Sequence, residues 1–275
     1  ETLPRSMAII GGGVIGLEFA SLIAAYGKSV TVLEFCREIL PGFDTAVAKR
    51  LRTYLGKRGI RIITGARVTS VSHDRTVTYE AKGKEAAVEA DLVISAVGRR
   101  PVLPDGLESA GVELTERGFI KTDDSYSTTA EGIYAIGDVN GKCMLAHAAE
   151  AQARIVTGKA ASTGVVPGVV FTVPECAIVG LNAAAEDGLL SASVPYGSNA
   201  KALAAGHTEG VVKLVARADG TIVGCQAVGA HAADLIAEAA VAIDAGYTVG
   251  RLAYNTVSAH PGLSELLSEA AAHLA

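Results

Sequence analysis

The spacing of apolar residues divides the first part of the chain into alternating strands and helices. Short apolar runs typical of buried strands lie at residues 6–11, 29–34 and 60–63, and apolar side chains recur at helical spacing over 14–26 and 44–58. Gly27 and Gly59 follow the two helical stretches as helix-ending residues, and Asp44 is a suitable N-cap. Strands that alternate with helices predict a parallel sheet with covered faces.

The pattern changes after this region. Residues 67–72 and 76–79 alternate between apolar and polar side chains, which predicts a small antiparallel meander. Residues 91–96 then read as another buried strand, and the turn at 98–101 closes it. We therefore expect an α/β fold for residues 1–101, namely a Rossmann-like domain with an antiparallel meander.

The rest of the chain has a different organisation. Residues 102–162 form a separate piece, in which we expect a strand over 132–138 that ends in a tight turn and a helix over 145–158. A linker at 164–168 leads to short strands, a polar loop near 199–209, a hairpin over 211–228, and helices near 231–245 and 263–274. Strands followed by helices predict an α+β domain. The predicted domains are thus 1–101, 102–162 and 163–275.

Composition and charge narrow the classes of partner. The 275 residues include 24 basic and 29 acidic side chains, so the chain lacks the basic character of a nucleic-acid-binding protein. Its apolar runs are shorter than the roughly 18 residues of a membrane span. Glu1 to Ser6 lead straight into a strand-like run and do not resemble a signal peptide. We expect a cytoplasmic protein that binds neither nucleic acid nor membrane.

The cysteine spacing argues against a metal site and a local redox pair. Cys36, Cys143, Cys176 and Cys225 form neither a CxxC nor a CxxxxC pair. We therefore expect four reduced, mostly buried thiols and no metal centre.

A glycine-rich turn lies between the first strand and the first helix. In Gly11-x-Gly13-x-x-Gly16, the first glycine allows a sharp turn, the second lets a pyrophosphate approach the backbone, and the third lets the helix pack closely on the sheet. The free N–H groups of a helix that begins near Val14 would face the phosphates. The preceding strand and following helix make this a predicted dinucleotide site.

Glu34 indicates which dinucleotide is bound. It ends the second strand, 18 residues after Gly16, close to the expected spacing of about 20. A carboxylate there accepts hydrogen bonds from the ribose hydroxyls and repels a 2′-phosphate, which favours NAD over NADP. The alternative interpretation is a solvated acid at a strand end, with glycines that serve only a tight turn.

Several motifs together resemble the flavin-dependent disulfide oxidoreductases. They are Gly11 to Glu18 with Val30 to Phe35, Ala96 to Pro101, Tyr134 to Val139, Met144 to His147, Phe171 to Glu175, Gly229 to Ile236, and Ala259 to Glu265. Within that family, three of these segments resemble the dihydrolipoamide dehydrogenases: Met144 to His147, Phe171 to Glu175 and Gly229 to Ile236. The resemblance covers nearly the whole chain.

The resemblance implies a role for particular residues. The implied NAD site consists of Gly11, Gly12, Gly13, Val14, Ile15, Gly16, Leu17, Glu18, Glu34, Val68 and Gly98. Asp138 would bind the ribityl chain of FAD, and Met144, Leu145, Ala146 and His147 would run past its ring. His260 would be the general acid–base for the thiols of dihydrolipoamide, held by Glu265, and would act in the partner subunit of a homodimer formed through residues 163–275. A 2-oxo acid dehydrogenase complex is a candidate partner.

Taken singly, some of these residues have simpler interpretations. His260 before Pro261 is typical of a helix start, and Asp138 after a glycine is typical of a turn. His147 alone would be a helix-surface or core histidine, and Glu18 alone would be solvated. The motifs around them favour the functional roles.

The sequence departs from the family motifs at places that limit the activity expected of this chain. Ser258 and Gly262 replace a histidine and a threonine of the last motif, which would loosen how His260 is held. The resemblance implies a preceding flavin domain with its own GxGxxG and CxxxxC pair, and the chain has only one GxGxxG and no such cysteine pair. Its remaining flavin-side residues are those of 102–162, which we expect to be a remnant of that domain. We expect the chain to be a fragment of a longer enzyme, and the alternative is a natural half whose flavin domain is elsewhere. Alone, it would bind NAD and dimerise without reducing a disulfide.

Two alternatives stay open beside this expectation. One is an NAD-binding dimeric module without turnover. The other is a related reductase of the same fold, although Glu34 disfavours a glutathione reductase, which prefers NADPH. His260 and the cysteine-free C-terminal segment disfavour a mercuric reductase.

Overall fold

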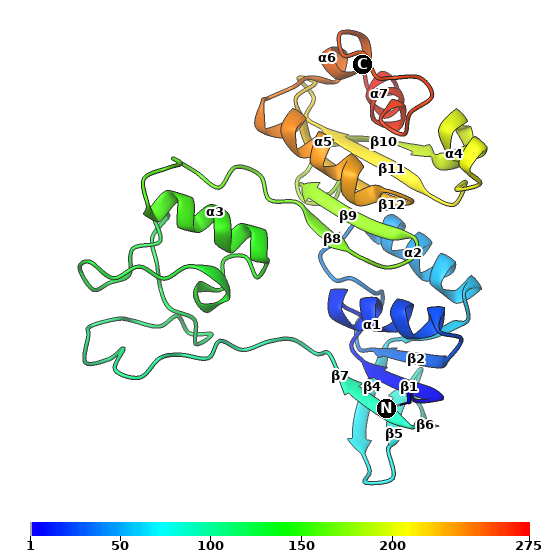
Figure 1. Ribbon diagram of the computed structural model, residues 1–275, viewed down its shortest axis with the longest axis vertical. Helices are drawn as coiled ribbons and strands as arrows, with labels where there is room; N and C mark the ends of the chain where they lie inside the picture. Colours follow the sequence, from blue (N-terminus) through cyan, green and yellow to red (C-terminus); the bar gives the residue numbers. More distant parts are fainter. Residues whose placement is uncertain (1) are drawn as a thin grey trace. The chain divides into compact units, whose positions relative to one another are not determined.

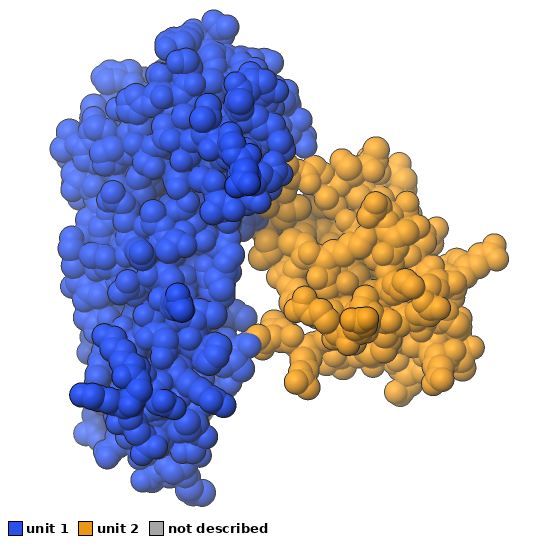
Figure 2. Space-filling view, turned by 180° about the vertical axis from the view of Figure 1, so that it is seen from behind, with its two compact units in different colours: residues 1–97, 167–275 blue, residues 98–166 orange. Residues whose placement is uncertain are grey.

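The computed structural model describes residues 2–275, which form two compact units (Figure 2). The first unit comprises residues 1–97 and 167–275, and the second comprises residues 98–166. We call residues 1–97 the parallel-sheet half of the first unit and residues 167–275 its antiparallel-sheet half. Over the described residues, the helices are too short or too polar to cross a membrane.

A four-stranded parallel sheet forms the centre of the parallel-sheet half (Figure 1). Its strands are β1 (Ser6–Ile10), β2 (Ser29–Glu34), β3 (Ile60–Thr64) and β7 (Leu92–Ser95), in the order β3-β2-β1-β7. Helices α1 (Val14–Ala25) and α2 (Thr45–Lys57) follow β1 and β2. The Asp44 side chain caps α2 by accepting the N–H groups of Ala46 and Val47 at 2.9 and 3.2 Å. The predicted parallel α/β fold is therefore confirmed.

Helices α1 and α2 pack on one face of this sheet, and the antiparallel meander packs on the other. Met7 and Ile9 of β1 point into the cluster that contains the apolar side chains of α1 and α2. Ala8 lies on the opposite face, as the two-residue period of a strand requires, and packs with Val77 and Tyr79 of the meander. The meander consists of β4 (Ala66–Val71), β5 (Thr76–Ala81) and β6 (Lys84–Glu89), all antiparallel, as predicted.

A five-stranded antiparallel sheet forms the other half of the first unit. Its strands are β8 (Gly168–Val170), β9 (Glu175–Gly180), β10 (Leu190–Pro195), β11 (Val211–Ala216) and β12 (Ile222–Gly229), in the order β10-β11-β12-β9-β8. Helix α5 (Ala232–Asp244) packs on β9 and β12, and α7 (Glu265–Ala272) packs on β10, β11 and α6 (Val249–Tyr254). This arrangement confirms the predicted α+β fold.

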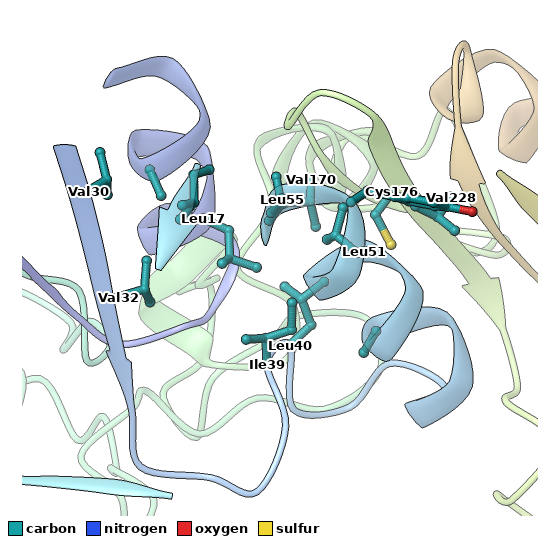
Figure 3. Packing of buried hydrophobic residues seen from close by; sticks show 14 of the residues in the cluster. Leu17, Val30, Val32, Ile39, Leu40, Leu51, Leu55, Val170, Cys176 and Val228 are labelled. Carbon is teal, nitrogen blue, oxygen red and sulfur yellow. The ribbon is translucent and has the colours of Figure 1, made fainter. Parts of the chain in front are cut away.

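One apolar cluster joins the two halves of the first unit. It contains Leu51 and Leu55 of α2 together with Val170, Cys176 and Val228 of the antiparallel sheet (Figure 3). A buried polar network lies at the same junction. The Lys213 ammonium pairs with the Asp44 carboxylate at 2.5 Å, and the Gln226 side chain accepts the Asp44 backbone N–H at 2.7 Å. The halves therefore fold against each other as one body.

The second unit has little regular structure. It contains the 3-10 helix η1 (Gly137–Asn140) and the helix α3 (Ala146–Val156), and Val112, Ile120 and Ala135 form its small buried cluster. The buried Gln152 side chain of α3 accepts hydrogen bonds from the Gly137 N–H at 2.8 Å and the Asn140 amide at 2.9 Å. These two bonds hold the turn at 137–140 against α3.

Some local predictions were wrong. Residues 132–136 do not form a regular strand, because their pairing within the described residues is a single bridge from Tyr134 to Ser127. The expected polar loop near 199–209 contains α4 (Ala200–Ala205). Cys176 and Cys225 are buried, but Cys36 is exposed and Cys143 is half-buried. All four thiols are free, as expected.

Candidate functional site: a glycine turn and a histidine–glutamate pair

The glycine turn after β1 has no room for side chains at two positions. Gly11 adopts φ +108°, and a Cβ atom there would lie 2.5 Å from the Ala96 carbonyl oxygen of the adjoining strand end. A Cβ atom at Gly16 would lie 2.1 Å from the Gly11 carbonyl oxygen. The first glycine thus makes the turn, and the third brings α1 close to it, as the sequence predicts.

Gly13 lies in a different environment from the other two glycines. No heavy atom lies within 4 Å of the place its Cβ would occupy, so the backbone there faces open space. Gly13 is also the N-cap of α1, with an extended backbone and no side chain to bond the helix end. The N–H groups of the first turn, from Val14 to Gly16, have no acceptor within the helix. An anion can therefore approach this helix end directly.

Glu34 is buried beneath the glycine turn. Its Oε2 accepts the Gly12 N–H and its Oε1 accepts the Cys36 N–H, both at 2.5 Å. The residue is 6% exposed, which contradicts the interpretation as a solvated acid. A carboxylate has about four acceptor positions, and these two bonds use about half of them. The Cys36 thiol also hydrogen-bonds to this carboxylate, which raises the pKa of Cys36.

The other predicted NAD-site residues lie in several environments. Leu17 is fully buried in the core, whereas Ile15 beside it is 42% exposed. Glu18 is not simply solvated, because its Oε1 accepts the Phe171 N–H at 2.9 Å. Val68 lies at a bulge in β4 and packs against the sheet. Gly98, at φ +128°, follows β7 and belongs to the second unit.

His260 and Glu265 form a hydrogen-bonded pair. The His260 Nδ1 lies 2.9 Å from the Glu265 Oε1, and the Glu265 Oε2 accepts the Gly262 N–H at 2.9 Å. The Gly262 hydrogen bond, and next the His260 hydrogen bond, hold the pKa of Glu265 below its ordinary value. An ionised carboxylate is only an acceptor, so the His260 Nδ1 is the donor in this pair, and in the neutral imidazole the Nε2 is the acceptor.

The segment around His260 is held by a residue at the start of α4. Asn199 is 4% exposed and donates from its Nδ2 to the Gly262 carbonyl at 2.9 Å. A Cβ atom at Gly262 would lie 2.6 Å from the Ala259 carbonyl oxygen, so the turn is closed tightly at this glycine. The absence of a Cβ atom lets this turn close, and the expectation that Gly262 loosens the pair stays a prediction.

The predicted flavin-side residues lie on the second unit. The Asp138 carboxylate is half-exposed and lies 3.9 Å from the Arg99 guanidinium. Met144, Ala146 and His147 are exposed at the start of α3, and Leu145, half-buried, is its N-cap. The structure therefore places all of these side chains at the start of α3 or in the turn held by Gln152.

Asn199 and Ser21 support these sites and were not among the predicted residues, and the hydrogen bond of Gly262 was not predicted either. Asn199 is followed by an alanine-rich run and by Gly206 in a left-handed conformation, which together are the signature of a capped helix. Ser21 accepts the Val173 N–H at 3.0 Å one turn after Glu18. Gly262 donates its N–H to Glu265. In the part of the chain that the structure describes, His, Cys, Asp and Glu side chains do not gather into a group of three or more that could hold a metal ion.

The chain is similar in sequence to known protein families over most of its length. Residues 1–153 match the pyridine nucleotide-disulphide oxidoreductase family, and residues 166–271 match the dimerisation domain of the same family. The chain is 39% identical over 284 residues to a dihydrolipoyl dehydrogenase of Geobacillus stearothermophilus and 40% identical over 287 residues to one of Bacillus subtilis. It is covered to 98% in both comparisons and spans 60% and 61% of those relatives.

Solved structures give the same result. LpdA of Mycobacterium tuberculosis superposes with a TM-score of 0.89 at 31% identity, over 100% of this chain and 62% of that one. The HOCl-induced flavoprotein disulfide reductase RclA of Escherichia coli superposes with a TM-score of 0.87 at 29% identity, over 98% of this chain and 65% of that one. Sequence, fold and glycine turn agree: the chain belongs to the pyridine nucleotide-disulphide oxidoreductase family.

Proposed function

We propose that this chain is the NAD-binding and dimerisation part of a dihydrolipoyl dehydrogenase, which oxidises dihydrolipoamide through FAD and a redox disulfide and reduces NAD. The observation that carries the proposal is the presence of two features in one folded unit. One is the glycine turn backed by Glu34, and the other is the His260–Glu265 pair. A glutathione reductase-like function accounts for the histidine–glutamate pair but not for Glu34. A mercuric reductase-like function accounts for the NAD turn but not for His260.

The dinucleotide would lie along the start of α1. Its pyrophosphate would face the open space at Gly13 and the free N–H groups of Val14 and Ile15. The ribose hydroxyls would donate to the remaining acceptor positions of Glu34. A 2′-phosphate at that place would face a buried carboxylate, which is electrostatically unfavourable. Val68 completes the proposed NAD site within the first unit.

The His260–Glu265 pair would move a proton to and from a thiol. A thiol with a pKa near 8.5 is mostly protonated at neutral pH, and a thiolate is the form that attacks a disulfide. The Glu265 carboxylate keeps the Nδ1 proton in place, so the exposed Nε2 can take the thiol proton and return it. His260 is thus the proposed general acid–base, and Glu265 orients it.

The remaining proposals concern the assembly. The domain division stays 1–101, 102–162 and 163–275, with dimerisation through the last segment. Asp138 in the turn at 137–140 and Met144 to His147 at the start of α3 would hold part of the flavin, and the side chains of Asp138 and Met144 are exposed. FAD supplies electron transfer between the dithiol and the nicotinamide when bound. A 2-oxo acid dehydrogenase complex is the proposed larger partner, in the cytoplasm.

Dinucleotide preference is the direct test of the Glu34 assignment. We expect the purified chain to bind NADH at least tenfold more tightly than NADPH in fluorescence titrations. Glu34→Gln should narrow this ratio because it removes the carboxylate charge. Glu38→Gln is the matched control, since Glu38 is nearby but pairs with Arg52 at 2.7 Å. Equal or tighter binding of NADPH by the unaltered chain would contradict the assignment.

Disulfide chemistry tests the second half of the proposal. We expect the isolated chain to oxidise no dihydrolipoamide, because its four cysteines are free and not spaced as a redox pair. The coding sequence upstream of Glu1 should encode a CxxxxC pair. In the complete enzyme, His260→Ala should reduce turnover by about 10²–10⁴-fold. His231→Ala, which removes the histidine of another carboxylate pair at 3.2 Å, should leave turnover nearly unchanged.

Sedimentation of the purified chain tests the dimer. A species of twice the chain mass at micromolar concentration is expected, and a monomer at all concentrations would overturn the proposed dimerisation. Dinucleotide binding and dimerisation by the chain, combined with an upstream coding region that lacks a CxxxxC pair, would favour the second candidate, an NAD-binding dimeric module without turnover.

A further inference from the structure

Asn199 connects the start of α4 to the turn that follows His260. Its Oδ1 accepts the Ala202 N–H at 3.0 Å and thereby caps α4. Its Nδ2 donates to the Gly262 carbonyl at 2.9 Å, which lies 63 residues further along the chain. Both polar atoms of one buried side chain are therefore engaged, and they act on two separate segments.

Gly262 transmits this contact to the histidine. Its carbonyl accepts from Asn199, and its N–H donates to the Glu265 Oε2 at 2.9 Å. The other oxygen of Glu265 accepts from the His260 Nδ1. Three successive hydrogen bonds thus run from a buried amide to the imidazole. The 2.6 Å approach of a Gly262 Cβ to the Ala259 carbonyl shows how little freedom the turn between them has.

Packing alone holds the imidazole weakly. The His260 side chain is 72% exposed, whereas the Glu265 side chain is 33% exposed and Asn199 is 4% exposed. An exposed side chain keeps several rotamers unless a hydrogen bond selects one. Asn199 is therefore the fixed end of this series of hydrogen bonds, and the exposed His260 imidazole is its mobile end.

We propose that Asn199 is a positioning residue for the His260–Glu265 pair: it fixes Gly262 so that Glu265 receives the Gly262 N–H and holds the His260 Nδ1 proton. This role rests on the proposed proton-transfer function of the pair for its biological meaning. The geometric coupling itself can be measured without any turnover.

A substitution can separate the two roles of Asn199. Aspartate caps helices as well as asparagine does, so Asn199→Asp retains the acceptor for Ala202. It replaces the Nδ2 donor with an acceptor that faces the Gly262 carbonyl, and two acceptors repel. Asn199→Ser likewise retains a cap and removes the donor without adding charge. Asn182→Asp is the matched control, because Asn182 also accepts a nearby N–H, from Ala184 at 3.0 Å, outside this segment.

Nitrogen-15 NMR of the histidine rings in this chain is the test. In the unaltered chain, neutral His260 should be mainly the Nδ1–H tautomer. Asn199→Asp and Asn199→Ser should lower the ratio of Nδ1–H to Nε2–H by about three- to tenfold, and should raise the pKa of Glu265 toward its ordinary value. Asn182→Asp should change neither quantity, and the far-ultraviolet circular dichroism of all variants should match the unaltered chain.

The outcomes separate this inference from the proposed function. An unchanged tautomer ratio and an unchanged Glu265 pKa in both Asn199 variants would overturn the positioning role. A shifted ratio supports it even where the complete protein fails to oxidise dihydrolipoamide, and that failure would count against the proposed function alone. In a complete enzyme with that activity, Asn199→Ser should lower kcat about tenfold and leave the KM for NAD unchanged.

Discussion

The two compact units bury apolar surface in different ways. In the first unit, residues from both sheets meet in one cluster, and side chains such as Leu17, Leu51 and Val170 are fully buried. The second unit has a cluster centred on Val112, Ile120 and Ala135, and it leaves Ile133, Tyr134 and Ile136 substantially exposed. A larger share of the first unit's apolar side chains therefore contributes to its own stability.

This difference bears on how each candidate site is held. The glycine turn lies between β1 and α1, whose apolar faces are buried, so the backbone of the turn is fixed by packing. Asp138 depends on a short turn that two hydrogen bonds to Gln152 hold in place. The glycine turn is thus preorganised by a core, whereas the proposed flavin-side residues rest on a few polar contacts.

The largest expected effect comes from the cluster shared by the two halves. Leu51→Ala removes a fully buried side chain and should lower the free energy of unfolding by about 4 kcal/mol. Urea unfolding followed by circular dichroism measures this, with Arg50→Ala on the exposed face of α2 as control. The two halves should unfold in one transition. Two separate transitions would break the interpretation of the first unit as one body.

A smaller effect is expected from the polar network at the same junction. Lys213→Met leaves the buried Asp44 carboxylate without its cation and should cost about 2 kcal/mol at neutral pH, because the Ala46 and Val47 N–H groups still bind it. The control is Lys57→Met, whose pair with Glu209 is on the surface and should contribute less than about 0.5 kcal/mol. Equal effects of the two substitutions would contradict a buried role.

The same pair predicts a pH dependence. Burial alone would raise the pKa of Asp44, but Lys213 and the two N–H groups outweigh it and hold the pKa below its ordinary value. A depressed folded-state pKa adds stability above the unfolded value of about 3.9, and that stability is lost as the pH falls further. In Lys213→Met the pKa of Asp44 should lie closer to its unfolded value, so less stability is lost as the pH falls, and the difference in stability between the two proteins should narrow. If the melting temperatures of the unaltered chain and Lys213→Met fall equally as the pH is lowered, Lys213 does not lower the pKa of Asp44.

The small cluster of the second unit should respond locally. Val112→Ala removes two methyl groups and should cost about 1.5 kcal/mol. Hydrogen exchange should accelerate within residues 98–166, and protection of β1 and β2 should be unchanged. Spread of the effect into residues 1–97 would show that the two units are more strongly coupled than their separate cores indicate.

The smallest effect is expected at the surface of the second unit. Arg99 and Asp138 lie 3.9 Å apart with both side chains at least half-exposed, so water screens their attraction. Arg99→Ala should change the stability by less than about 0.5 kcal/mol. A larger loss on denaturant titration would mean that this pair, rather than Gln152, holds the turn at 137–140.

Local signals in the sequence predicted much of the fold. The strand, glycine turn and helix at residues 6–25 follow from an apolar run, three glycines and helical spacing, all within a few residues. The stretch at 132–138 carries a similar strand signal but forms no regular strand, since a strand also needs neighbours to pair with. The helix at 200–205 was missed although its Asn199 cap could have indicated it.

The candidate site likewise has features that the sequence predicted and features that it could not show. The residue types and spacing around Gly11, Glu34 and His260 were enough to predict a dinucleotide turn and, through the family resemblance, a histidine–glutamate pair. The sequence could not show that Glu34 is buried against Gly12, or that Glu18 accepts an N–H from Phe171, 153 residues away. Such contacts depend on how distant segments pack, and no local pattern encodes them.

The sequence by itself determined the parallel α/β arrangement, the glycine turn and the acid at the end of β2, because these depend on short-range periodicity and on backbone conformations that glycine alone tolerates. The tertiary structure decided which halves share a core, which carboxylates are buried, and that Asn199 reaches Gly262 beside His260. These features are set by long-range packing, which removes some polar groups from water and brings their partners within hydrogen-bonding distance.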